Sequence, residues 1–310
     1  MTANKDFKNI APERFEVVGA RTSDADSLNK KQISFWGEVY YRFSHNKLAL
    51  IGLIFLMFIA VMAIFAPMFS QWSYGQNTGL YNSPPSADHW FGTDDLARDI
   101  FVRVWMGARI SLFIGLAAAF IDLIIGILWG SISGLAGGRL DNIMMRIADI
   151  LTAIPYLLVV IILLVVMEKG LIPMIIALCI TGWVNMARIV RAEVLSIKSR
   201  EYVLASRTLG AGTWHLIKRH LIPNAMGAIL VTMTLTIPSA IFTESFLSYI
   251  GLGVQQPMAS WGTMASEGNK ALTSYPWRLF FPALFISLTI FAFNAVGDGL
   301  RDALDPKLRK

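Results

Sequence analysis

Long apolar runs alternate with polar, charged segments along this chain, and their lengths predict its architecture. A helix needs roughly 20 apolar residues to cross a hydrocarbon layer of about 30 Å. Six runs meet or approach that length: Leu48–Phe69, Ile110–Leu135, Ile150–Met167, Leu171–Ala187, Ala225–Leu247 and Leu279–Gly297. The fourth run is short and contains Pro173 and Gly182, so its limits stay open. The pattern predicts an all-α, polytopic membrane protein with six transmembrane helices.

Composition agrees with that class. Of the 310 residues, 55% are hydrophobic and 15% are charged, which excludes a soluble domain with an ordinary surface. The single cysteine, Cys179, excludes a disulfide within the chain and a thiolate metal cluster, and we expect it to be a small packing residue. The first apolar run follows a long polar tail, so we expect no cleavable signal peptide.

The basic residues predict the orientation of the spans. Outside the six runs, 21 Lys and Arg residues fall on one side and six on the other. The richer side comprises residues 1–47, 134–149, 188–224 and 298–310. The positive-inside rule therefore predicts cytoplasmic termini. A nucleic-acid role is the rival interpretation of a basic chain, but these charges are spread over membrane-flanking loops rather than gathered on one face.

The same counting divides the chain into regions. We expect a cytoplasmic tail and interfacial helix over 1–47, a first transmembrane helix over 48–69, an external loop over 70–109, a core domain over 110–297 with a cytoplasmic loop at 188–224, and a cytoplasmic tail over 298–310. Residues 1–29 are polar, and we expect them to be loosely ordered. Aromatic and apolar residues then recur at helical spacing, at Trp36, Val39, Tyr40 and Phe43. They indicate either a helix lying in the membrane surface or a simple aromatic anchor.

The polar segment Glu201–Asn224, between the fourth and fifth runs, predicts two short helices. Ser199 is placed to cap the first helix, and Glu201 lies in its first turn, where the helix dipole favours an anion. Gly210 can end that helix in the left-handed conformation, and Pro223 is expected to end the second helix. Small residues between these points would let another surface approach the backbone closely.

This segment resembles the cytoplasmic coupling loop of ABC-importer permeases, whose pattern is Glu-Ala-Ala, three residues, Gly, nine residues, Ile-x-Leu-Pro. Ala205, Gly210 and Pro223 fall on the pattern. The chain departs from it at four positions, namely Leu204 for Glu, Ser206 for Ala, His220 for Ile and Ile222 for Leu. The resemblance implies that an ATPase docks here, on Glu201, Ala205, Ser206, Arg207, Leu209, Gly210 and Pro223. The alternative is an ordinary helix–turn–helix loop.

Four further blocks resemble signatures of the C-type permease subunits of dipeptide and oligopeptide ABC importers. They are His89–Leu112, Gly137–Pro155, Glu244–Gly262 and Phe293–Pro306, so the resemblance covers roughly residues 35 to 310. In the first block, Phe91 replaces the usual leucine and Ala97 the usual glycine. Physically, this block predicts a turn capped by Asp94 or Thr93, with a local salt bridge to Arg98. We expect such a turn to stabilise the outer loop, and contact with the substrate is the alternative.

The resemblance also implies what surrounds the chain. It implies a second permease subunit, two ATPase subunits that carry ATP and Mg, an external solute-binding protein, a peptide substrate and the cell membrane of a bacterium or archaeon. The chain itself has no Gly-x-x-x-x-Gly-Lys-Ser/Thr loop and no zinc or hydrolase motif, so we expect no catalytic, cofactor or metal site in it. His215 and His220 are five residues apart on a short helix and are not expected to share a face.

Four polar residues interrupt the apolar runs: Asp122, Asn185, Glu244 and Asn294. A polar or ionisable group at membrane depth is costly, so each should face a pathway or bridge two helices by a hydrogen bond. Asp122 is closest to the middle of a run, whereas Glu244 lies near an end, within reach of the interface.

Two alternatives to a peptide importer follow from the same residues. A nickel, glutathione or other small-solute importer would share the family blocks. An ion-coupled secondary carrier would use Asp122 and Glu244, work without ATPase subunits and show inverted repeats, of which none is evident.

Overall fold

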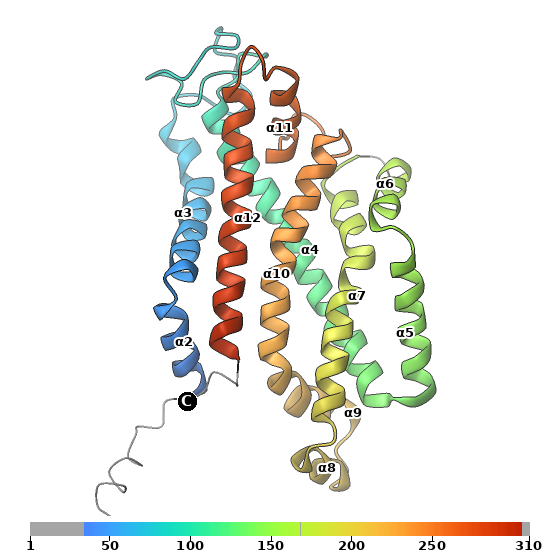
Figure 1. The fold of residues 1–310 in the computed structure, drawn as a ribbon. Helices are drawn as coiled ribbons and strands as arrows, with labels where there is room; N and C mark the ends of the chain where they lie inside the picture. The colour runs from blue at the N-terminus through green and yellow to red at the C-terminus, as the bar shows by residue number, and fades with distance from the viewer. Residues whose placement is uncertain (1–33, 168, 306–310) are drawn as a thin grey trace, which may run out of the picture. The chain divides into compact units, whose positions relative to one another are not determined.

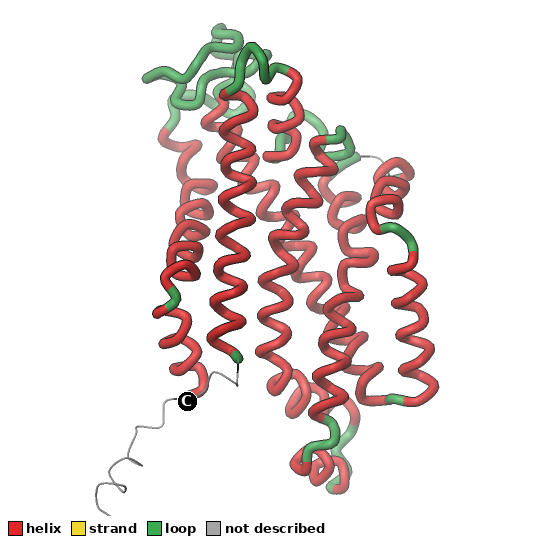
Figure 2. The backbone as a smooth tube through the Cα atoms, in the orientation of Figure 1, coloured by secondary structure: helices red, strands yellow, loops and turns green. Residues whose placement is uncertain are grey.

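A computed structural model describes residues 34–167 and 169–305 and divides the chain into two units, Met1–Glu38 and Val39–Lys310. Within the described residues the structure is helical and has no strand, only an isolated bridge between Thr93 and Asp99 (Figure 2). Five helices are long and apolar enough to cross a membrane, or six if one bent pair counts as a span. The all-α prediction is confirmed. The predicted loose tail, residues 1–29, lies outside the described residues.

The helices follow the apolar runs but most are longer than them (Figure 1). They are α2 (Phe35–His45), α3 (Lys47–Phe69), α4 (Ile100–Ala136), α5 (Gly138–Ala153), α6 (Tyr156–Val166), α7 (Leu171–Ile197), α8 (Glu201–Thr208), α9 (Thr213–Leu216), the π-helical η3 (Ile217–Leu221), α10 (Ile222–Tyr249), α11 (Trp261–Lys270) and α12 (Trp277–Leu304). The predicted loops 70–109, 134–149 and 188–224 and the tail 298–310 are therefore partly helical.

Helix caps and close packing explain two of these extensions. Helix α4 begins at Ile100, before the apolar run, because Asp99 caps it and accepts a hydrogen bond from the Val102 backbone N–H at 2.9 Å. Helix α12 continues through Gly299 to Leu304, and the absence of a side chain at Gly299 lets α12 pack closely on Ala49 of α3. That glycine lets two helices approach closely rather than ending one of them.

The third predicted span is bent rather than straight. Helices α5 and α6 meet at an angle of 79°, and Ile154 between them is extended, with φ −83° and ψ 131°. Pro155 follows directly, and a proline both lacks a backbone N–H and disfavours the helical conformation of the residue before it. The prediction of one helix over Ile150–Met167 is therefore wrong at the break.

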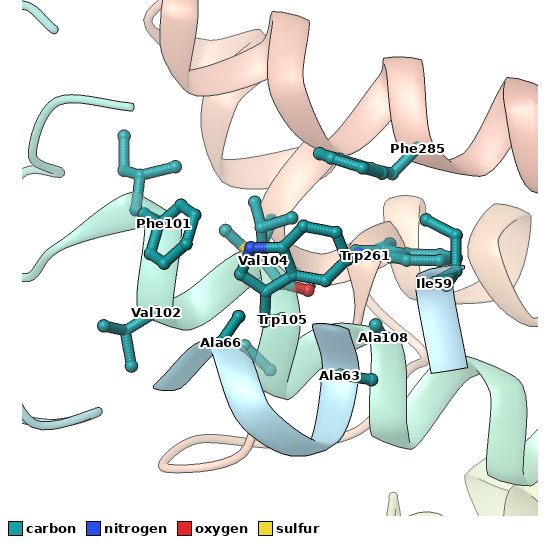
Figure 3. Close-up of a cluster of buried hydrophobic side chains, with 13 residues drawn as sticks. Ile59, Ala63, Ala66, Phe101, Val102, Val104, Trp105, Ala108, Trp261 and Phe285 are labelled. Carbon is teal, nitrogen blue, oxygen red and sulfur yellow. Dashed lines mark hydrogen bonds between the residues drawn. The ribbon is translucent and has the colours of Figure 1, made fainter. Parts of the chain in front are cut away.

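Two of the interfaces that hold the bundle together involve α4. Along α4, Gly126, Gly130 and Gly134 recur every fourth residue and lie against α7, where a Cβ at Gly130 would collide with the Ala187 backbone. At the end of the bundle that carries α11, a cluster of buried side chains joins α3, α4, α11 and α12 (Figure 3). The cluster includes the fully buried Trp261, whose Nε1–H donates to the Val104 carbonyl oxygen at 2.9 Å.

At the other end of the bundle, where α8 and α9 lie, α3 begins and α12 ends (Figure 1). Val39 and Phe43 of α2 pack there against Ala303 and Leu304 of α12. Trp36 and Tyr40, which share the aromatic stripe in the sequence, are exposed. The stripe therefore serves packing at two of its four positions.

Candidate functional site

The segment with the coupling-loop pattern forms a compact turn at one end of the bundle, where the short helix α8 is followed by the start of a long helix that returns to the bundle (Figure 1). Val203 of α8 is buried and packs in one cluster with Leu216 and Leu221 of the returning chain. Gly210 has φ +89°, as the sequence predicted, and reverses the chain direction after α8. Ala205 is exposed on the opposite side of α8 from that cluster. The segment thus presents one face to the bundle and another outward.

The predicted ends of the two short helices are only partly right. Ser199 does not cap α8, because its hydroxyl donates to the Ser196 carbonyl oxygen at 3.4 Å and Arg200 occupies the N-cap position. Pro223 does not end a helix either: the chain is helical from Thr213 to Tyr249, and Pro223 lies in the first turn of α10. A proline is tolerated there because the π-helical turn before it already breaks the regular hydrogen-bond register.

The π-helical turn also brings two histidines together. The rings of His215 and His220 lie 6.0 Å apart, so the expectation that they point to different faces is wrong. A π turn is wider than an α turn, and it places residues five apart close to one face. Nε2 of His220 lies 3.2 Å from the Ser206 hydroxyl of α8. Two positions at which this chain departs from the family pattern therefore contact each other.

A cavity of 380 Å³ lies between α4, α7 and α10, with Tyr156 of α6 at its wall. It brings together two of the four predicted membrane-depth polar residues, Asp122 and Asn185. Asp122 is 4% exposed, and its Oδ1 has no hydrogen-bond partner among the described residues. The carboxylate occupies space left by Gly182, where a side chain would collide with it.

The rest of the polar lining was missed by the sequence reasoning. Helix α10 contributes four hydroxyl groups to the cavity, from Thr232, Thr236, Ser239 and Thr243. Their spacing of four, three and four residues places them on one helical face. Hydroxyl residues recurring at helical spacing within the fifth apolar run were a readable signal for this wall.

The other two predicted polar residues lie elsewhere. Glu244 is fully buried and does not reach an interface; its carboxylate accepts hydrogen bonds from Ser111 of α4 at 3.0 Å and from Ser248 at 2.8 Å. Asn294 is exposed on α12 and does not line the cavity. Of the four residues, Glu244 thus bridges two helices, while Asp122 and Asn185 face a shared space.

Ion pairs stabilise the loop between α3 and α4. Asp94 caps the predicted turn, accepts hydrogen bonds from the backbone N–H groups of Leu96 and Arg98, both at 2.9 Å, and pairs with the Arg98 side chain at 2.7 Å. Ala97 has φ +57°, which explains why the family signature has a glycine there. Arg103 extends the network to Asp94 at 3.4 Å.

Tyr74 ties this loop to the segment before α11. Its hydroxyl donates to the Pro257 carbonyl oxygen at 2.8 Å, and its ring lies 5.5 Å from Cζ of Arg103. Burial raises the pKa of Tyr74 above its ordinary value, so the hydroxyl keeps its proton and remains a donor.

Acidic residues of the second family block anchor α5 to α7. Asp141 accepts two hydrogen bonds from Arg191, both at 2.6 Å, and a further one from the Ser133 hydroxyl. Asp149 pairs with Arg188 at 2.9 Å. Among the described residues no group of three or more His, Cys, Asp or Glu side chains could hold a metal ion. These acids therefore have structural partners.

Comparison with known proteins identifies the family. The family described as binding-protein-dependent transport system inner membrane component matches residues 126–310, and the N-terminal TM domain of oligopeptide transport permease C matches residues 34–85. The chain is 65% identical over 306 residues to the oligopeptide transport system permease protein OppC of Bacillus subtilis, covering 98% of this chain and 100% of that protein.

A second relative and a solved structure agree. The dipeptide transport system permease protein DppC of Bacillus subtilis is 55% identical over 305 residues, which is 97% of this chain and 95% of that protein. An inward-facing structure of the MetNI methionine ABC transporter matches with a TM-score of 0.51 at 16% identity, over 66% of this chain and 98% of that one, and shows the shared fold. The chain therefore belongs to the binding-protein-dependent transport system inner membrane components and, within them, to the OppC/DppC-type permeases.

Proposed function

We propose that this chain forms half of the translocation pathway of an ATP-driven peptide importer and receives the ATPase through α8. The observation that supports this proposal most strongly is an exposed apolar surface on the segment Glu201–Asn224. Tyr202, Leu204, Leu209 and Trp214 are between 45% and 89% exposed there, although Val203 holds the same segment firmly to the bundle. Apolar side chains at a membrane protein's water-facing end need a partner that covers them.

The partners follow from what the chain lacks. It has no phosphate-binding loop, and its resemblance to ABC-importer permeases implies that ATP and Mg²⁺ bind to two separate ATPase subunits. A second permease would complete the pathway, and an external solute-binding protein would deliver the substrate. The two Bacillus subtilis relatives are named for oligopeptide and dipeptide transport, which supports peptides over nickel or glutathione.

The orientation is part of the proposal. The 21-to-six distribution of basic residues supports placing the α8 end, and both termini, in the cytoplasm of a bacterial or archaeal cell. A cysteine at exposed Ser86, in a Cys179→Ala background, should react with an impermeant reagent in intact cells. A cysteine at Ser199 should react only after the cells are opened, and the reverse pattern would exclude this orientation.

Docking is tested on α8 itself. In the full complex, Ala205→Glu places a charged chain on the exposed face, and Gly210→Val puts a β-branched residue at φ +89°. We expect both variants to insert into the membrane, to lose ATPase during purification and to lose ATP-driven uptake. Ser199→Glu is the matched control, since it adds the same charge to the same segment outside α8.

Two results separate the interpretations. Loss of bound ATPase in Ala205→Glu and Gly210→Val, with normal binding in Ser199→Glu, supports docking on α8. Normal uptake and a full complement of ATPase in both variants would show that the segment is an ordinary helix–turn–helix loop.

A further inference from the structure

The four hydroxyl groups that α10 contributes to the cavity are oriented as acceptors. Each donates its proton to the carbonyl oxygen four residues earlier in α10: Thr232 to Ala228 at 2.7 Å, Thr236 to Thr232 at 2.9 Å, Ser239 to Leu235 at 3.2 Å and Thr243 to Ser239 at 2.9 Å. A hydroxyl has one proton and two lone pairs. With the proton committed to the helix, the oxygen can only accept further hydrogen bonds from the cavity.

Asp122 adds a carboxylate to the same wall. Its Oδ1 is buried without a hydrogen-bond partner among the described residues, although Asp122 is only 4% exposed. None of the described residues that line the cavity is a lysine, arginine or histidine. An ionised or even a neutral carboxyl group buried without a partner is costly. The described lining therefore offers a carboxylate and several hydroxyl acceptors but no cationic side chain to bind them.

The wall opposite Asp122 accommodates its buried carboxylate. Gly182 of α7 faces Asp122, and any side chain there would overlap the carboxylate. Asn185, which brings a carboxamide to the lining, belongs to the same helix. Because Gly182 has no side chain, the Asp122 carboxylate fits between α4 and α7 at the wall of the cavity.

We propose that this cavity is a recognition subsite for a primary ammonium group, with Asp122 as its counter-charge and the α10 hydroxyls as the remaining acceptors. An ammonium group offers three protons and no acceptor, which complements such a lining. The volume of 380 Å³ falls within the range of about 300–1,000 Å³ typical of small-molecule sites. This assignment rests on the proposed function: the ammonium group is the amino terminus of the transported peptide.

Charge selectivity of the cavity can be measured without transport. Ile189, a half-buried lining residue, is changed to cysteine in a Cys179→Ala background of the assembled transporter. Its reaction rates with 2-aminoethyl and 2-sulfonatoethyl methanethiosulfonate are compared after normalisation to free cysteine. We expect the cationic reagent to react about tenfold faster or more, and Asp122→Asn to bring the ratio near one. Equal rates with Asp122 intact would overturn the proposal, even if Asp122→Asn fails to fold.

A control tests whether any buried acid has this effect. Glu244→Gln makes the same carboxylate-to-carboxamide change in the same bundle, but outside the cavity. We expect it to leave the ratio of reagent rates unchanged. A fall in this ratio equal to that of Asp122→Asn would mean that the selectivity comes from the bundle as a whole, and the subsite would be wrong.

Uptake then tests the identity of the bound group. Trialanine should slow modification of the cysteine at position 189, whereas N-acetyl-trialanine should not. In the full complex, Asp122→Asn should lower kcat/KM for trialanine about tenfold, and Asp122→Glu should recover part of it. Unchanged trialanine uptake in Asp122→Asn would refute the subsite while leaving the importer standing; no ATP-driven peptide uptake by the wild-type complex would refute the proposed function instead.

Discussion

Helices α4 and α10 bury a carboxylate at two places, and the two surroundings differ sharply. Near the α11 end, Glu244 accepts hydrogen bonds from Ser111 and Ser248, and Ser111 also accepts from the Trp261 backbone N–H at 3.2 Å. Midway along the helices, Asp122 faces a cavity and leaves one carboxylate oxygen without a partner among the described residues. Both residues are at least 96% shielded from solvent, since Glu244 is 0% and Asp122 4% exposed.

The difference separates a structural acid from one that is available to a substrate. A carboxylate whose two oxygens both accept hydrogen bonds from neighbouring hydroxyls stabilises the contact between the helices. A carboxylate with a free oxygen and an empty space beside it raises the free energy of the bundle until a donor arrives. Burial alone does not distinguish the two; the number of partners does.

The largest effect is expected from Glu244→Ala. It removes the acceptor shared by Ser111 and Ser248 and leaves a hole in a fully buried site, at a cost of about 3 kcal/mol. The thermal unfolding midpoint of the detergent-solubilised protein should fall clearly. Asp122→Ala is the matched change and should leave that midpoint unchanged or raise it, because it removes no hydrogen bond from Oδ1. Equal destabilisation by both variants would contradict the comparison.

A smaller effect is expected at Gly182. A methyl group there collides with the Asp122 carboxylate, so Gly182→Ala should destabilise the protein by about 2 kcal/mol. The double variant Gly182→Ala/Asp122→Ala should recover most of that loss, because the overlapping group is gone. The unfolding midpoints of the two single variants and the double variant form the test. Additive losses would mean that the two residues do not compete for the same space.

The smallest effect compares two serines on α4 that are both 0% exposed. The Ser111 hydroxyl bridges Glu244 and Trp261, whereas the Ser131 hydroxyl has no hydrogen-bond partner among the described residues. Ser111→Ala should therefore cost about 1 kcal/mol, and Ser131→Ala should be neutral or slightly stabilising. Unfolding midpoints measured side by side decide between this ranking and a uniform cost of removing buried hydroxyls.

Much of the fold was predictable because lipid imposes a simple rule on sequence. The apolar runs mark the long helices that form the bundle. The left-handed conformation of Gly210 follows from its place after a short helix. The helix ends were harder, since Asp99 and the π-helical turn before Pro223 act through local hydrogen bonds that hydropathy does not report.

The site was less predictable for a related reason. Asp122 and Glu244 look alike in sequence, as single acids within apolar runs. Their roles differ because Ser111 of α4 donates a hydrogen bond to Glu244 of α10, whereas the missing side chain at Gly182 leaves room for the Asp122 carboxylate. The packing of α4 against α10 places Ser111 beside Glu244, and its packing against α7 places Gly182 beside Asp122. Only tertiary structure shows which acid is satisfied.

The central claim is that ATP, rather than an ion gradient acting on Asp122, drives transport through this chain. The direct measurement is trialanine uptake into vesicles that hold the full complex, with internal ATP and with the proton and sodium gradients collapsed. The account predicts uptake that requires ATP, survives collapse of both gradients and remains measurable in Asp122→Asn. Gradient-driven uptake by this chain alone, without ATP or ATPase subunits, would contradict it.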